Sequence, residues 1–109
     1  MSSIGRIRHT AEVLAVIRRG QKIRTPYLLL YLLPAKQWRM ACVVGKKVSK
    51  SAVVRHRIQR QLREIVRDVV VGASGGPYDV VVVALPSAVK VDSHQILRQA
   101  VISAVSKLQ

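Results

Sequence analysis

The residues of this sequence best suited to chemistry are the lysines and arginines between Lys46 and Arg67, where eight of the chain's nineteen such residues occupy twenty-two positions. Guanidinium and ammonium groups bind phosphates, because each combines a positive charge with several N–H donors. The whole chain has a formal net charge of +14, far more than solubility requires. This excess indicates an anionic polymer as the partner and argues against a small-molecule substrate.

Apolar residues in the same segment predict an amphipathic helix. From Val54 to Val69 they recur every three or four positions, which is the period of a helix that buries one face. With about 100° of rotation per residue, the opposite face gathers basic side chains within roughly 60° and along about 16 Å. These residues, which we call the basic stripe, are His56, Arg60, Arg63 and Arg67. A stripe of this length can meet several consecutive phosphates of a polyanion.

Two other interpretations of the basic stripe are less favoured. An ordinary solvated helix face interleaves acidic residues with basic ones, and this stripe has none. A membrane-surface helix would need its apolar face for lipid, but the core needs that face here. We therefore expect the stripe to bind nucleic acid and expect no membrane partner.

The acidic residues and histidines do not predict a catalytic or metal site. A self-sufficient metal-dependent nuclease needs several carboxylates that converge on one or two cations. The chain has only five, which are Glu12, Glu64, Asp68, Asp79 and Asp92. Glu64 and Asp68 are one helical turn apart, and among so many arginines we expect them to form ion pairs within the helix. No cysteine or histidine pair has zinc-ligand spacing, and His56, between two arginines, favours RNA contact over general-acid catalysis.

Length and composition predict a single domain of a protein that functions inside the cell. A chain of 109 residues, half of them apolar, can bury one modest core. Cys42 is the only cysteine and sits in an apolar run, so we expect a buried thiol and no intrachain disulfide. The sequence contains no apolar segment of about 20 residues and no signal-peptide pattern at its start. These features predict a soluble, cytoplasmic protein.

The remaining elements are predicted from hydrophobic period and from turn residues. We expect a mobile basic arm over residues 1–9, followed by a short helix that is capped by Thr10, runs through Arg19 and ends at Gly20. Residues 27–33 and 40–45 are predicted to form a β-hairpin, with a short strand before it near residues 22–25. Pro26 and Pro34 leave too few residues between them for a stable helix.

The second half of the chain alternates between helix and strand. Ser49 or Ser51 is expected to cap the central helix, which is predicted to end at Gly72. A valine-rich strand over residues 78–85 follows, parallel to the strand that ends at Gly45. A last helix begins at the capping box of Asp92. The pattern therefore predicts an α+β sandwich, with helices packed on a small sheet.

The central segment resembles the bacterial ribonuclease P protein family. The family's signature is a lysine pair followed by a helix that contains Arg-Asn-Arg and further basic residues. The matching residues here are Lys46-Lys47 and then Ala52-Val53-Val54-Arg55-His56-Arg57-Ile58-Gln59-Arg60-Gln61-Leu62-Arg63-Glu64. The resemblance extends to Arg6-Ile7-Arg8 before a short helix, Arg18-Arg19-Gly20, Leu30-Tyr31-Leu32 and Tyr78-Asp79-Val80-Val81.

The resemblance implies a fold and an activity. The implied fold is a two-layer α/β sandwich of the class of ribosomal protein S5 domain 2, in the order α-β-β-β-α-β-α. Its four-stranded sheet has a left-handed βαβ crossover, and residues 1–109 form one RNA-binding domain. The implied function is that of the protein subunit of ribonuclease P, the endoribonuclease that removes the 5′ leader of precursor tRNA. The active site and its Mg²⁺ belong to the catalytic RNA, so no catalytic residue, metal or other cofactor is expected in the protein.

The resemblance also implies two sets of RNA-binding residues. Contact with the catalytic RNA is implied for Lys46, Lys47, Lys50, Arg55, His56, Arg57, Arg60 and Arg63. Arg67 is added on the helical-face argument alone. Contact with the tRNA leader is implied for a cleft between the first helix and the sheet, formed by Val13, Ile17 and Tyr31. Family members often have aromatic residues at the first two of these positions, but this chain contains no phenylalanine.

Two further positions depart from the family pattern, and two other functions remain as alternatives. His56 stands where the family usually has asparagine, and Gln59 stands where lysine is common. The main alternative is a structural ribosomal protein, which would bind RNA through a similar charged surface. A protein that binds double-stranded DNA is the third possibility. It is the least favoured, because the stripe has long arginines, whereas recognition of base edges in DNA uses short side chains.

Overall fold

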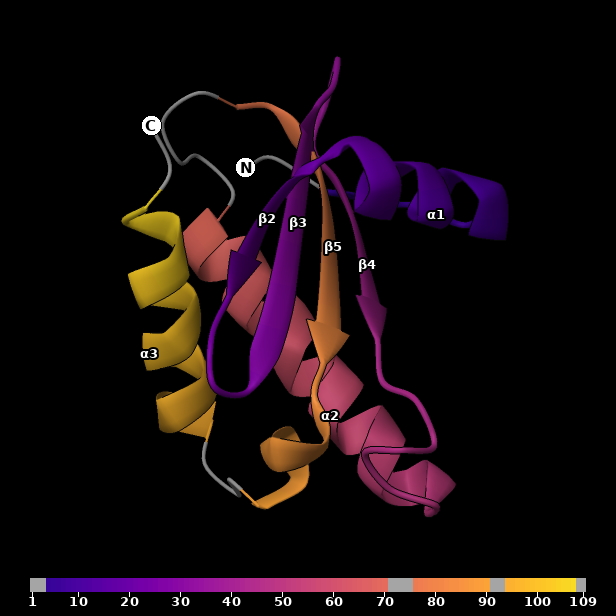
Figure 1. Cartoon of the computed structure of the whole chain (residues 1–109), viewed down its shortest axis with the longest axis vertical. Helices are drawn as coiled ribbons and strands as arrows, with labels where there is room; N and C mark the ends of the chain where they lie inside the picture. The colour runs from indigo at the N-terminus through magenta and orange to yellow at the C-terminus, as the bar shows by residue number, and fades with distance from the viewer. Residues whose placement is uncertain (1–3, 71–75, 91–93, 108–109) are drawn as a thin grey trace.

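The computed structural model describes residues 4–70, 76–90 and 94–107. These residues form five β-strands and three α-helices (Figure 1). In chain order they are β1 (Gly5–Arg6), α1 (Thr10–Arg19), β2 (Gln21–Arg24), β3 (Leu28–Pro34), β4 (Arg39–Val43), α2 (Ala52–Ile65), β5 (Tyr78–Ala84) and α3 (His94–Val105). A π-helical turn, Val66–Val70, continues α2, and a 3₁₀ turn, Pro86–Lys90, follows β5.

β5 is the central strand of the sheet, whose order is β1-β4-β5-β3-β2. Its valines at positions 80, 81 and 82 are fully buried, as suits a strand that is covered on both faces. It runs parallel to β4 and antiparallel to β3. The parallel pairing of β4 and β5, joined by α2, confirms the predicted crossover. In Figure 1 both strands point down the page, β4 lies to the right of β5 and α2 passes behind them, which corresponds to a left-handed connection.

The predicted hairpin between residues 27–33 and 40–45 is wrong, because β5 lies between β3 and β4. The short connection from β3 to β4 crosses the end of β5, where the Ala35 N–H donates to the carbonyl of Pro77 over 3.1 Å. The hairpin forms instead between β2 and β3, with Ile23 opposite Leu30. The valine run of β5 gains most from burial on both faces, so it occupies the central position and separates β4 from β3.

β1 adds a fifth strand to a sheet that was predicted to have four. It lies parallel to β4 at the edge of the sheet, where the Gly5 N–H donates to Trp38 O and the Ile7 N–H donates to Met40 O. Ile7 is buried and fixes the end of this segment to the protein. The arm that was predicted to be mobile is therefore paired with the sheet from Gly5 to Ile7. A two-residue strand is too short to show a periodic pattern in the sequence.

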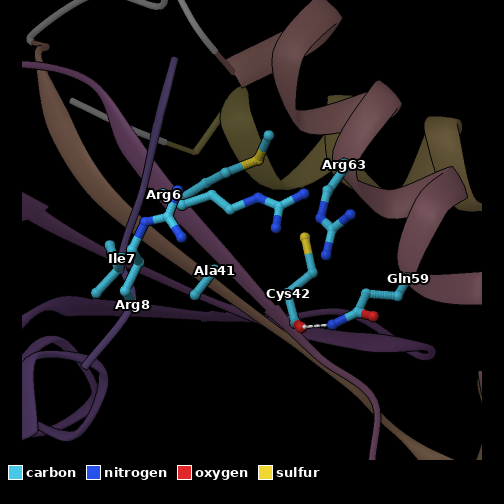
Figure 2. Close-up of a pocket in the computed structure, with 8 residues that line it drawn as sticks. Arg6, Ile7, Arg8, Ala41, Cys42, Gln59 and Arg63 are labelled. Carbon is cyan, nitrogen blue, oxygen red and sulfur yellow. Dashed lines mark hydrogen bonds between the residues drawn. The ribbon is translucent and has the colours of Figure 1, made fainter. Parts of the chain in front are cut away.

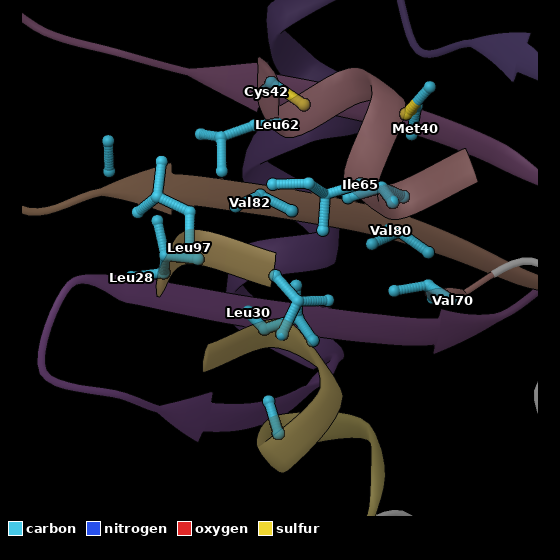
Figure 3. Close-up of a cluster of buried hydrophobic side chains, with 14 of the residues drawn as sticks. Leu28, Leu30, Met40, Cys42, Leu62, Ile65, Val70, Val80, Val82 and Leu97 are labelled. Atoms are coloured by element: carbon cyan, nitrogen blue, oxygen red, sulfur yellow. The ribbon is translucent and has the colours of Figure 1, made fainter. Parts of the chain in front are cut away.

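Helices cover both faces of the sheet. On one face α2 and α3 pack against β3 and β5, where Leu62 and Leu97 meet Leu30 and Val82 in the larger core (Figure 3). On the other face α1 packs through Val16 against Tyr31 and Val81 in a smaller cluster. The α+β class is confirmed, but the prediction of two layers is wrong. Successive residues of β3 and β5 point to opposite faces of the sheet, and most of the side chains on each face are apolar. Each face of the sheet is therefore covered by at least one helix.

Local signals position the ends of α1 and α2. The Ser51 hydroxyl accepts a hydrogen bond from the Val54 N–H at 3.3 Å, which confirms Ser51 as the N-cap of α2. In α1 the N-cap position belongs to His9, so the prediction of Thr10 as the cap is wrong, whereas Gly20 ends the helix as predicted. A Cβ on Gly20 would lie 2.6 Å from Val16 O and 2.9 Å from Leu32 O, so only glycine fits there. The predicted end at Gly72 and the cap at Asp92 lie outside the described residues.

Candidate nucleic-acid interface

The basic stripe lies on the outer face of α2 and of the π-helical turn that continues it. The helix turns Ile58, Leu62 and Ile65 into the core, where their exposed fractions are 4%, 0% and 0%. On the other side, His56, Arg60 and Arg67 are exposed, whereas Arg63 is half-buried. Arg57 is also exposed, on a flank of the same helix. The period that buries one face of α2 therefore presents the opposite, charged face to solvent.

The loop before α2 contains the three predicted lysines, Lys46, Lys47 and Lys50, and we call it the lysine loop. Lys46, Lys47 and Lys50 are exposed and surround one open hollow of about 640 Å³. Arg55 Nη1 donates to the carbonyls of Ser49 and Lys50, each at 3.0 Å. Arg55 was predicted to contact RNA directly. The structure gives it a further role, because it holds the lysine loop against the first turn of α2.

A third basic group, missed by the site prediction, comes from the N-terminal segment. Arg6 and Arg8 lie on and just after β1, and with Arg63 and Gln59 of α2 they line a cavity of about 310 Å³ (Figure 2). Gln59 Nε2 donates to the carbonyl of Cys42 at 2.8 Å, which ties α2 to β4. The alternation of Arg6, Ile7 and Arg8 is too short to establish the period of a strand, so the sequence carries no signal for this position.

Cys42 contributes the thiol that lines this cavity. Its residue is 7% exposed, and burial raises the pKa of its thiol to about 12. The positive charges of Arg63 and Arg6 act in the opposite direction and only partly offset the burial. The thiol is therefore protonated at neutral pH, which makes it a weak nucleophile and a weak metal ligand.

The raised pKa of Cys42 predicts a loss of stability at alkaline pH. The unfolded thiol ionises near pH 9, whereas the folded thiol keeps its proton until about pH 12. Between these values the unfolded state binds fewer protons, so the free energy of unfolding falls as the pH rises. Urea unfolding of the wild type and of Cys42→Ala should show a steeper fall for the wild type across this window. Parallel curves for the two proteins would contradict the assignment.

The second predicted surface, the leader cleft, lies on the opposite face of the sheet. Val13 and Ile17 of α1 are half-buried and pack in one cluster with Tyr31, which is 7% exposed. Lys22 and Arg24 of β2 are exposed, and they pair in register with Tyr31 and Leu29, so their side chains share this face. The structure thus brings the three predicted residues together. It adds two basic residues that the sequence prediction missed.

An ionic group centred on Arg39 joins this face to α1. Arg39 Nε and Nη2 donate to the Asp79 carboxylate at 2.9 and 2.8 Å, and Nη1 donates to Glu12 Oε2 at 3.0 Å. These hydrogen bonds raise the pKa of Arg39 above its ordinary value, so the group stays charged. The sequence carries no local signal for this group, because its members lie on β4, β5 and α1.

Another acidic residue departs from its prediction. Asp68 pairs across to Arg98 of α3, with Oδ2 and Nη1 3.4 Å apart, rather than within its own helix. The prediction of an intrahelical pair is therefore wrong for Asp68.

Within residues 4–70, 76–90 and 94–107, no group of three or more histidine, cysteine or acidic residues could hold a metal ion. Among the helices of those same residues, none is long and apolar enough to cross a membrane.

Replacing Arg39 should weaken the attachment of α1 to the sheet and lower the stability of the fold. In Arg39→Ala the Asp79 carboxylate, 11% exposed, would lose both hydrogen bonds from its partner. An unsatisfied buried acceptor costs about 1–3 kcal/mol, so we expect the free energy of unfolding in urea to fall by that amount. Glu12→Gln is the matched comparison, because Glu12 is 40% exposed and its loss should cost less. Equal effects of the two substitutions would show that the Asp79 contact is not the stronger one.

The comparisons of this sequence with known proteins agree on one family. The family model described as Ribonuclease P matches residues 1–109. The ribonuclease P protein component of a Cyanothece species is 31% identical over 112 residues, covering 86% of this chain and 85% of that protein. The component of Thermus thermophilus is 38% identical over 85 residues, covering 78% of this chain and 49% of that protein.

Solved structures give the same result for the fold. The RNase P protein of Staphylococcus aureus superposes with a TM-score of 0.80 at 20% identity, covering 95% of this chain and 94% of that one. The RNase P protein of Thermotoga maritima gives 0.79 at 19% identity, covering 95% and 97%. At these identities the likeness establishes a shared fold and leaves individual contacts to be argued from this chain's own residues.

Proposed function

Since this chain belongs to the ribonuclease P protein family, we propose that it holds two RNA molecules on opposite faces of its sheet. The protein is a subunit of ribonuclease P, whose family acts in tRNA 5′ maturation, and its partner is the RNA of that enzyme. The proposal concerns how the subunit divides its surface between that RNA and precursor tRNA.

The observation that carries the proposal is the separation of the two surfaces by the sheet. The basic stripe and the lysine loop belong to α2 and its approach, on one face. The cluster of Val13, Ile17 and Tyr31 lies between α1 and the sheet, on the other face. Because the sheet stands between them, one RNA can occupy each surface without competing for the same side chains.

The α2 face is proposed to bind the catalytic RNA through its phosphates. Long, exposed guanidinium groups suit the backbone and shape of a folded RNA better than its base edges. The residues proposed for this contact are Lys46, Lys47, Lys50, Arg55, His56, Arg57, Arg60, Arg63 and Arg67. Arg55 also contributes by holding the lysine loop in place.

The α1 face is proposed to bind the leader of precursor tRNA. Val13 and Ile17 offer apolar contact but cannot stack on a base as an aromatic ring does, a difference of about 1–3 kcal/mol per stacked base. Lys22 and Arg24, exposed on the same face, supply charge for the leader's phosphates. We therefore expect leader binding here to depend more on charge than it would with aromatic residues at those two positions.

The reaction itself is proposed to take place in the RNA, with the protein as a non-catalytic subunit. Asp79 and Glu12 are engaged by Arg39, and Asp68 pairs with Arg98. Carboxylates held by arginines are poor candidates for coordinating a catalytic cation. Mg²⁺ would then be held at the RNA active site, and the complex would work in the cytoplasm, where precursor tRNA is made.

Reconstitution with the cognate ribonuclease P RNA tests this function. Precursor tRNA cleavage would be measured at low magnesium, with and without protein, on substrates that carry a long leader or a single leader nucleotide. We expect the protein to stimulate cleavage, and to do so more strongly for the long leader. No stimulation of either substrate, with the protein bound instead to ribosomes, would overturn the proposal. Equal stimulation of both would remove the leader contact from it.

A further inference from the structure

The cavity between β1, β4 and α2 is lined by charged groups that the basic stripe alone does not explain. Arg6 and Arg8 reach it from the N-terminal segment and Arg63 reaches it from α2, around about 310 Å³ of space. In Figure 2 the side chain of Arg6 extends toward Arg63, above the thiol of Cys42. We propose that this cavity is a binding site for a single backbone phosphate of RNA, held jointly by β1 and α2. The inference rests on the proposed function and adds a site to it.

The charges around the cavity are uncompensated. None of its lining residues is acidic. Over the described parts of the chain, the guanidinium groups of Arg6, Arg8 and Arg63 form no hydrogen bond or ion pair. By contrast, Arg39 uses three nitrogens on two carboxylates. Three positive groups around one space repel one another, and an anion placed between them removes that repulsion.

The chemistry of the cavity fits a phosphate group of RNA better than a base. Each guanidinium presents a planar fork of N–H donors that matches two phosphate oxygens, and forks from two elements can hold one phosphate from two sides. No aromatic residue lines the cavity, so it offers no surface on which a base could stack. Arg63 also belongs to the basic stripe, so an RNA strand that follows α2 passes the mouth of this cavity.

The geometry of β1 makes the site specific to the folded protein. β1 pairs with β4 through only two residues, and Ile7 is its buried anchor. Gln59 of α2, whose side-chain amide donates to the Cys42 carbonyl, also lines the cavity. These contacts bring Arg6 and Arg63 to one space, although they are far apart in the chain.

Titration of the full chain with inorganic phosphate, followed by NMR, tests the site without RNA. We expect the backbone amides of residues 6–8 and the side-chain amide of Gln59 to shift together. Arg6→Ala and Arg63→Ala should each abolish these shifts, whereas Arg24→Ala, at the opposite edge of the sheet, should leave them unchanged. Shifts that survive Arg6→Ala, or that spread evenly over all basic segments, would overturn the proposal.

A double-substitution cycle with ribonuclease P RNA separates this site from the general function. At 0.1 M salt, losing one phosphate contact should weaken binding by about five- to eightfold. Arg6→Ala and Arg63→Ala should each do so, and the double variant should lose little more, because both residues hold one phosphate. If the wild type binds the RNA tightly but the losses of affinity from the two substitutions add up in the double variant, the shared site is refuted and the proposed function is not. Absence of wild-type binding, with the phosphate shifts intact, would refute the proposed function and leave the site standing.

Discussion

Replacing Arg60, Arg63 and Arg67 together by alanine is expected to weaken binding of ribonuclease P RNA by roughly 100- to 500-fold at 0.1 M salt. We expect each residue to contact one phosphate, and each such contact contributes about 0.7–0.9 to the slope of log affinity against log salt concentration. The triple variant should therefore lower the slope by about 2–3. Filter binding or fluorescence anisotropy across a range of salt concentrations measures both quantities. Arg60 and Arg67 are exposed and Arg63 is half-buried, so the triple variant keeps every buried residue of α2 and should fold.

A charge-matched variant on the other face is the control for this experiment. Arg18, Arg19 and Arg24 are exposed on α1 and β2, and replacing them by alanine removes the same three charges. Without precursor tRNA present, this control triple should leave the affinity and the salt slope close to those of the wild type. If the two triple variants lose the same affinity for the RNA, binding depends on net charge and α2 is not a specific interface. If only the α1 and β2 triple loses affinity, the faces have been assigned the wrong way round.

The second large effect is expected in the core, from Leu62→Ala. Leu62 is 0% exposed and lies where α2 packs on the sheet and on α3 (Figure 3). Truncation of a buried leucine removes its burial and leaves a cavity, at a cost of about 2–5 kcal/mol. Small domains have about 5–15 kcal/mol in total, so this one substitution can remove much of the stability. Urea unfolding monitored by circular dichroism measures the difference in the free energy of unfolding.

Val53→Ala is the control for the core substitution. Val53 belongs to the same helix but is 78% exposed, so its loss should change stability by about 0.5 kcal/mol or less. Since α2 carries the basic stripe on its outer face, Leu62→Ala should also weaken RNA binding in proportion to the unfolded fraction. An unchanged unfolding midpoint in Leu62→Ala would contradict the placement of this helix on the sheet.

The parts of the fold that the sequence predicted are those with a local signal. The spacing of Ile58, Leu62 and Ile65 fixes which face of α2 is buried, and Ser51 marks where the helix begins. The valine run of β5 indicates a strand that is buried on both faces, and its parallel pairing with β4 follows from the helix between them. These signals were sufficient to expect the basic stripe on the surface.

The errors concern pairings between distant segments. Nothing in residues 27–45 shows that β5, about forty residues later, inserts between β3 and β4. The third layer came from α1, whose short apolar face did not reveal which side of the sheet it covers. Strand order is a property of the whole sheet and depends on which strand gains most from central burial. Two adjacent strands in sequence were therefore mistaken for neighbours in space.

The missed parts of the site have the same origin. Arg6 was interpreted as part of a mobile arm, because a two-residue strand has no detectable period, and its position beside Arg63 depends on the pairing of β1 with β4. Arg39 looked like one more basic residue, although Asp79 and Glu12 hold it within the fold. In each case the charge was visible in the sequence, and its partner or neighbour was not.

Site-specific crosslinking in the reconstituted holoenzyme tests the division of the protein into two RNA-binding faces most directly. A photoreactive residue would replace Arg60 on α2 in one variant and Ile17 on α1 in another, each with labelled catalytic RNA and precursor tRNA present. We expect position 60 to crosslink to the catalytic RNA and position 17 to the leader of precursor tRNA. Crosslinks from both positions to the same RNA, or with the two RNAs exchanged, would contradict the account.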